Sequence, residues 1–178
     1  QLHRRQRQMC IRDSRYPLAE GFDIDYSVES NEVKQNLILR EVPVLPEAAE
    51  YFGLSEGLRM PVGYALFSGE TMLGEEIFKT QEDLQIRNIE TGELLVEIPA
   101  PMIMEAGAEE PYMGTFFVQV YGPEILLITV VESDWLLDED RVYPVAIDPS
   151  IRVNSNAGGY CYISVSYTHL TLPTMELV

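Results

Sequence analysis

The chain has 178 residues, of which 46% are hydrophobic, and a formal net charge of −17 at pH 7. This apolar content excludes a disordered acidic tail and predicts a globular domain. The negative charge opposes binding to nucleic acid and to anionic lipid. No apolar run reaches the roughly 18 residues that cross a bilayer, so no membrane insertion is expected. These properties define a class of protein but no reaction.

The two ends of the chain share one inverted DNA segment. Residues 4–14 read RRQRQMCIRDS and residues 165–174 read VSYTHLTLPT. With permitted codons, the two peptides back-translate into strings that are reverse complements over nearly their whole length. They resemble a transposon-end sequencing adapter, so we predict that residues 1–14 and 165–178 are non-native tails, loosely attached to the core. A basic N-terminal arm for nucleic acid is the disfavoured alternative.

The remaining chain divides into a β-sandwich module over 15–151 and the start of a linker or next module over 152–164. Both histidines, His3 and His169, lie in the predicted tails together with Cys10, which leaves Cys161 alone. Ser-His-Asp or Cys-His catalysis, the usual zinc sites and an internal disulfide are therefore excluded between the tails. We expect no enzyme activity and no cofactor.

The first half of the module shows strand signals around one helix-like window. Apolar and polar residues alternate over 22–28, and 33–39 returns after a turn, which predicts a hairpin. Asp23 and Asp25 share a face of the first strand. They could serve a glycosidase or a calcium ion, although a solvated face is the favoured interpretation. Residues 45–54 carry Ala and Glu and predict one or two helical turns, and 62–67 is a strand candidate.

The second half is richer in hairpins. Residues 84–89 and 94–98 flank a short Gly-containing loop, and 102–104 begins another extended piece. Residues 105–111 form an acidic loop, for which solvation is favoured over metal binding because the calcium-loop spacing is missing. Residues 115–121 and 124–131 form the most hydrophobic hairpin, with apolar residues on both faces, and are expected to supply central strands.

A closing element over 133–151 completes the module. Ser133 is the expected N-cap of a single helical turn whose Trp135, Leu136 and Leu137 face inward. Residues 142–147 follow as a strand, in which Pro144 indicates an edge position or a strand start, and Asp148-Pro149 ends it. Trp135 is expected to plug one end of the core.

Together these elements predict an all-β fold, an antiparallel β-sandwich of about eight to ten strands built of hairpins with one or two short helical turns. A four-bladed propeller or a barrel is the alternative. No blade-length repeat supports it.

Three segments also carry a family resemblance: FDIDY followed by VK, the GELLVEIPAP segment (92–101), and DWLLDEDRVYPVAIDPSI (134–151). They look like the β-rich region upstream of the repeats in large bacterial Rhs/YD-repeat, wall-associated surface proteins. In that family the Y-P-V-x-I-D-P segment commonly marks the end of one module before another, often of the kind called DNRLRE. The resemblance implies a non-catalytic module of a secreted or cell-surface protein, whose main partners are neighbouring domains of the same polypeptide.

Two other functions remain open beside the structural module. A carbohydrate- or calcium-binding sandwich would use Trp135 or the cluster Asp138, Glu139 and Asp140, since a lone Trp can stack a sugar and carboxylates bind calcium. A carboxylate-pair hydrolase would need two acidic side chains roughly 5–10 Å apart in a cleft. The structural module is favoured because fold alone does not provide chemistry.

Overall fold

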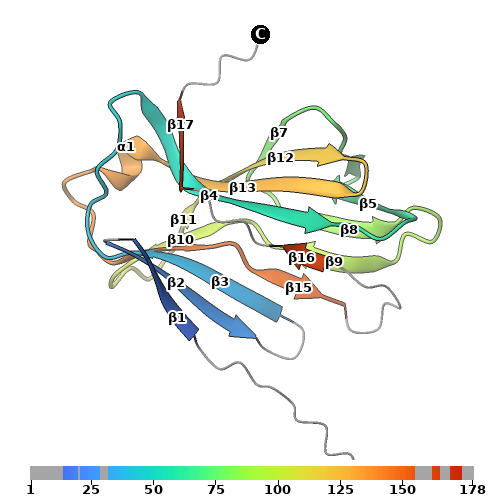
Figure 1. Ribbon diagram of the computed structural model, residues 1–178, viewed down its shortest axis with the longest axis horizontal. Coiled ribbons are helices and arrows are strands. Elements are labelled where there is room, and N and C mark those ends of the chain that lie inside the picture. Colours follow the sequence, from blue (N-terminus) through green and yellow to red (C-terminus); the bar gives the residue numbers. More distant parts are fainter. Residues whose placement is uncertain (1–13, 20, 29–31, 155–161, 165–168, 174–178) are drawn as a thin grey trace, which may run out of the picture.

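The computed structural model describes residues 14–19, 21–28, 32–154, 162–164 and 169–173. It confirms the all-β class: two antiparallel sheets face each other, and the described chain contains one short helix, α1 (Ser133–Leu136) (Figure 1). No helix in this described part is long and apolar enough to span a membrane.

The larger sheet, sheet A, has 11 strands and runs in the order β11-β10-β14-β3-β15-β9-β8-β5-β6, with β2 also on β3 and β1 on β2. Its strands are β1 (Ser14–Ala19), β2 (Phe22–Val28), β3 (Glu32–Leu39), β5 (Tyr64–Ser68), β6 (Thr71–Met72), β8 (Leu84–Asn88), β9 (Leu94–Ile98), β10 (Met102–Glu105), β11 (Tyr112–Met113), β14 (Val145–Asp148) and β15 (Ile151–Val153). The predicted hairpins β2–β3 and β8–β9 are confirmed.

The smaller sheet, sheet B, has six strands in the order β16-β4-β13-β12-β7, with β17 also on β4. Its strands are β4 (Ala49–Arg59), β7 (Phe78–Thr80), β12 (Thr115–Tyr121), β13 (Glu124–Glu132), β16 (Tyr162–Ser164) and β17 (His169–Pro173). The predicted hairpin β12–β13 is confirmed and lies in the interior of this sheet, as its apolar faces require.

The closing segment, residues 145–153, joins the two halves of sheet A. It keeps one register against β3, with Val145 opposite Leu39 and Ile151 opposite Val33. Its other side pairs first with β10 and then with β9. Pro149, which has no N–H to donate, separates β14 from β15 within this line. The strand predicted over 142–147 is confirmed from Val145 onward, whereas 142–144 lie outside it. Pro144 marks the strand start and not an edge position, because β14 lies between β10 and β3.

Two groups of buried apolar side chains fill the space between the sheets. The small core lies at the α1 end and comprises Ile24, Leu37, Leu39, Phe52, Leu54, Ile103, Val131, Leu136, Val145 and Ile147. The large core comprises Leu58, Met60, Leu66, Leu73, Leu84, Ile86, Leu95, Val96, Ile98, Phe116, Val118, Val120, Ile125, Leu127 and Ile151. Both cores take residues from β4 and β13, so these two strands connect the ends of the sandwich.

The helix predicted over 45–54 is wrong. Residues 49–59 form β4, the longest strand, which pairs with β13 over nine consecutive positions (Figure 1). Phe52, Leu54 and Leu58 alternate toward the cores. Pairing and burial along the whole strand outweigh the weak helical preference of Ala and Glu.

Gly53 brings β4 close to β13. A Cβ atom at Gly53 would lie 1.9 Å from the Thr129 backbone oxygen and 2.8 Å from the Val130 Cα. These are backbone atoms, so they cannot move aside as a flexible side chain would. Gly53 is therefore required by the space between the strands and not by its dihedral angles.

Two details of the closing element also differ from prediction. Glu132, and not Ser133, is the N-cap of α1, and no side chain caps the helix. Ser133 is the first helical residue, and its buried hydroxyl has no hydrogen-bond partner. Leu136 is buried as expected, whereas Leu137 is exposed because α1 ends before it.

The predicted tails lie mostly outside the described residues, but two strands extend into or beside them. The backbone of β17 pairs with β4 from Leu54 to Ala49, and that of β1 pairs with β2. The prediction of a loosely attached tail is therefore wrong for residues 169–173, which form a strand of sheet B. Backbone pairing is open to almost any sequence, so it does not decide where the tail came from.

The closing segment gives the first testable prediction. Ile147 is fully buried in the small core. We expect Ile147→Ala to lower the free energy of unfolding by about 2–5 kcal/mol, because it removes buried methyl groups and leaves a cavity. Chemical denaturation would measure this change. The control Val142→Ala, at an exposed position just before the strand, should change stability by less than about 0.5 kcal/mol. Equal losses in both variants would contradict the packing role of the segment.

Candidate functional site

Trp135 lies in α1 with two side chains packed against its indole. Tyr112 stacks on the ring with centroids 4.5 Å apart and an interplanar angle of 14°. The Arg141 guanidinium carbon lies 4.6 Å from the ring centroid. A stacked ring and a guanidinium at these distances both pack against the π surface of the indole. A sugar could stack on Trp135 only by displacing one of them.

The partners of Trp135 are themselves held in place. The Arg141 side chain donates to Glu105 Oε1 at 3.2 Å, and the Val142 backbone N–H donates to Glu105 Oε2 at 3.0 Å. The Tyr112 hydroxyl donates to Glu132 at 3.0 Å. Glu105 thus ties the end of β10 to the segment after α1. The acidic loop predicted at 105–111 begins with a residue that braces the fold.

The carboxylates of Asp138, Glu139 and Asp140 lie on an exposed turn beyond α1. Asp138 Oδ1 accepts the Asp140 backbone N–H at 2.8 Å, and the Asp138 carbonyl accepts the Arg141 N–H at 3.1 Å. Asp138 therefore closes its own turn, in the manner common for Asp. Within the described part of the chain, no three His, Cys, Asp or Glu side chains gather as a metal-binding group.

Asp23 and Asp25, the other acidic pair noted in the sequence, differ in their surroundings. Asp23 is buried and accepts from Arg40 Nη2 at 2.8 Å. Asp25 is half-buried. The pair lies on one face of β2, as the alternation predicts, but Asp23 is held in an ion pair with Arg40.

Two open grooves adjoin Glu132 on the surface. One, of about 540 Å³, is lined by Glu47, Ala48, Ala49, Glu50, Tyr51, Glu132 and Asp134. The other, of about 550 Å³, is lined by Lys79, Thr80, Gln81, Glu82, Thr115 and Glu132. Between them Lys79 donates to the Tyr51 hydroxyl at 2.9 Å and lies 5.2 Å from its ring centroid. This lysine thus occupies the polar end of Tyr51, at the border between the two grooves.

A group that the sequence analysis missed lies inside the sandwich. Gln35, Glu56 and Thr129 are buried, and Gln35 Nε2, Glu56 Oε2 and Thr129 Oγ1 have no hydrogen-bond partner. We call these three residues the polar layer. A buried polar atom without a hydrogen bond lowers the stability of the fold, so each of these three atoms needs a physical explanation.

The polar layer lies where the two cores meet. Glu56 follows Leu54 of the small core and precedes Leu58 of the large core on the same face of β4. Thr129 likewise lies between Leu127 and Val131 on β13. On β3, in the facing sheet, Gln35 precedes Leu37 by two residues and is buried on the same side of the strand. All three residues therefore lie at the level where one core ends and the other begins.

Burial raises the pKa of the Glu56 carboxyl to about 8. Desolvation is the cause, because the charged form loses its water and gains no cation. The carboxyl is thus protonated at neutral pH in the folded chain. The sequence did contain a signal for this residue. In FGLSEGL (52–58), Glu56 takes a position that alternates with Phe52, Leu54 and Leu58, and this pattern can be recognised once 49–59 is known to be a strand.

Comparisons with known proteins bring no relative to this site. No protein-family model, curated protein or solved structure matches the chain. Any functional proposal therefore depends on the sequence itself and on the fold and its side chains.

The protonated Glu56 predicts a pH-dependent stability. Its folded pKa of about 8 lies above the ordinary value of 4.5, so the folded chain binds the proton more tightly than the unfolded chain. The contribution of this proton to the free energy of unfolding is fully present below pH 4.5. It falls as the pH rises toward 8 and changes no further above that pH. Glu56→Gln keeps the shape of the protonated acid without its titration. At pH 7 we expect this variant to be more stable than the parent by up to about 3 kcal/mol, measured by urea unfolding.

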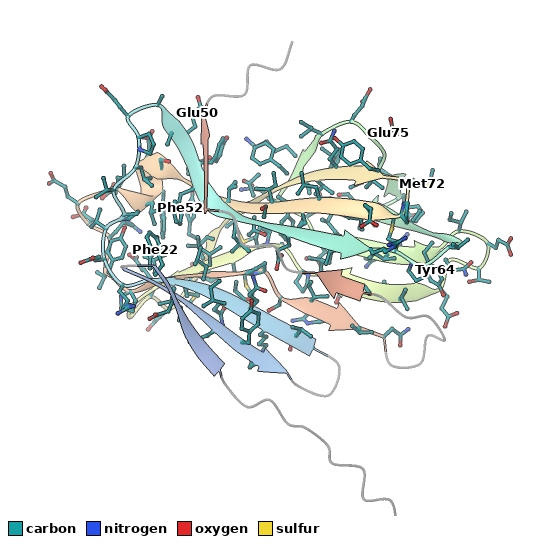
Figure 2. The ribbon with its side chains drawn as sticks, viewed as in Figure 1. Phe22, Glu50, Phe52, Tyr64, Met72 and Glu75 are labelled. Atoms are coloured by element: carbon teal, nitrogen blue, oxygen red, sulfur yellow. The ribbon has the colours of Figure 1, made fainter. Side chains whose placement is uncertain are left out.

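The matched control is Glu50→Gln, at an exposed position near the start of the same strand (Figure 2). It should leave the slope of stability against pH between 4.5 and 8 unchanged. If Glu56→Gln and the parent gave parallel profiles over this range, Glu56 would not be protonated in the folded chain.

The covered indole gives a third prediction. Trp135 is the single tryptophan of the chain, so its fluorescence reports on this site alone. Arg141→Ala removes the guanidinium from the indole ring, and we expect stronger acrylamide quenching and a red-shifted emission. Arg59→Ala, which removes an exposed partner of Glu124, serves as control and should leave both unchanged. Unchanged quenching in the Arg141 variant would show that the guanidinium does not shield the ring.

Proposed function

We propose that residues 15–151 form a non-catalytic structural module of a large secreted or cell-surface bacterial protein of the Rhs/YD-repeat type. Its partners would be neighbouring domains of the same polypeptide. The proposal takes residues 1–14 and 165–178 to be adapter-derived.

One observation carries this proposal: the motif behind the resemblance coincides with the segment that joins sheet A. Val145 and Ile147 of the Y-P-V-x-I-D-P motif are buried, and Asp148 accepts a hydrogen bond from Ser150. Trp135 and Arg141, just upstream, pack on each other. These motif residues make contacts within the fold. A segment used in this way suits a role in architecture better than a role in ligand binding.

The decisive experiment is to resequence the parent locus by a method that inserts no transposon ends. We expect the frame to continue beyond Ser164 into further β-modules and YD-type repeats. A genomic sequence that encodes residues 4–14 and 165–174 as they stand would overturn the proposal, because His3, His169 and Cys10 would then return as native residues.

A binding experiment separates the structural module from the glycan- or calcium-binding alternative. Thermal unfolding would be followed with calcium chloride and with a panel of soluble oligosaccharides. We expect no saturable rise in Tm, since a ligand that binds only the folded state raises Tm with its concentration. A saturable rise that Asp138→Asn or Trp135→Phe removes would instead support a binding module.

A further inference from the structure

The buried apolar side chains of the described chain form two clusters that stay separate, although β4 and β13 contribute to both. On the inner face of sheet B, Glu56 and Thr129 lie between the small core and the large core. Gln35 has the corresponding place on sheet A. The interval between the cores is therefore lined by the polar layer.

Glu56 and Thr129 are neighbours across two adjacent strands. Glu56 pairs with Leu127 on β13, and Thr129 pairs with Leu54 on β4. Thr129 thus lies two residues along β13 from the partner of Glu56, on the same face of the sheet. Diagonal neighbours of this kind are about 7–8 Å apart, a distance that a long side chain can span. The carboxyl and the hydroxyl therefore lie close together on the inner face of sheet B.

Gln35 reaches the same level from the facing sheet. Phe22 and Phe52 stack across the two sheets with ring centroids 5.7 Å apart (Figure 2). Phe22 is opposite Leu39 on β3. Gln35 lies four residues from Leu39, and Glu56 lies four residues from Phe52, both in the direction of the large core. Four residues of strand span about 13 Å on either sheet, so Gln35 and Glu56 lie at one level of the sandwich.

Each member of the polar layer presents one atom that makes no hydrogen bond within the described chain: Gln35 Nε2, Glu56 Oε2 and Thr129 Oγ1. These residues are 3%, 2% and 0% exposed, so bulk solvent does not reach them. Burial raises the pKa of the Glu56 carboxyl to about 8, so the group is neutral at neutral pH and has both a donor and an acceptor. Neutral polar atoms that converge from two sheets are the usual lining of a buried water site.

Small side chains leave room at this level. Pro149 is buried opposite Gln35, because the closing segment keeps its register against β3 from Ile147 to Ile151. Proline and threonine are shorter than the leucine and isoleucine side chains of the neighbouring levels. A water molecule takes a volume of about 30 Å³ and typically makes about three hydrogen bonds when buried. The polar layer offers that number of partners.

We propose that a water molecule is bound between the two sheets and held by Gln35 Nε2, Glu56 Oε2 and Thr129 Oγ1. The water accepts a hydrogen bond from the Gln35 amide, and its two hydrogens are donated to the Thr129 hydroxyl and the Glu56 carboxyl. This site satisfies all three buried atoms at once, and it lies where neither apolar core fills the sandwich.

A high-resolution crystal structure of the chain as it exists tests the site directly. We expect a water peak within hydrogen-bond distance of at least two of the three atoms. The lack of such a peak, or direct hydrogen bonds among the three side chains in its place, would overturn the proposal.

Magnetic relaxation dispersion of the solvent water nuclei gives the corresponding test in solution, since it counts waters that stay bound for longer than the protein takes to tumble. Thr129→Val keeps the shape of the side chain without its hydroxyl, and we expect the dispersion amplitude to fall by the contribution of one long-lived water. The matched control is Thr115→Val, because Thr115 is also buried on sheet B but its hydroxyl accepts from Gln81 Nε2 at 3.4 Å. The control should keep the amplitude of the parent.

Equal amplitudes in the parent and in Thr129→Val would overturn the site. If Thr129→Val does not fold, the crystal structure of the parent decides.

Discussion

The architecture depends on one line of backbone hydrogen bonds, that between β3 and the closing segment 145–153. In the described residues, β10 and β9 reach β3 only through this segment. Sheet A is therefore continuous because its last two strands in chain order, β14 and β15, fill its middle. Arg152 reinforces the junction from the surface by reaching Glu32 at 3.1 Å and Glu97 at 3.6 Å, on the two neighbouring strands. Such exposed pairs add little energy individually. The buried pairing is what makes two groups of hairpins into one sheet.

Local signals in the sequence were sufficient for the hairpins. Alternation predicted β2, and turn signals between apolar runs predicted the hairpins that contain β3, β8 and β9. The long strand β4 was missed because Ala and Glu near its start favour a helix, while its strand character comes from β13, about 75 residues later in the chain. Partners at that separation leave no local trace. The same limit applies to the order of strands in both sheets.

The candidate site residues show a similar division. The sequence could identify Trp135 and the acidic turn at 138–140 as unusual, but not that Tyr112 and Arg141 cover the indole. Nor could it identify the polar layer, since the burial of Gln35, Glu56 and Thr129 results only from the stacking of two sheets. Each of the three is a polar residue at a position of its strand where the neighbouring inward-facing residues are apolar. That interruption becomes informative only after the strand and its facing direction are known.

The close approach at Gly53 has a consequence for how this chain tolerates change. Glycine is a poor strand former, so a statistical scale would favour Val or Thr there. Yet any side chain at that position would enter the backbone of β13. Sequence drift in sheet B is therefore uneven: exposed positions on β4 can vary freely, while one residue without a side chain is fixed by the polypeptide beside it. Among divergent descendants of this fold, Gly53 should outlast most of the hydrophobic residues around it in β4.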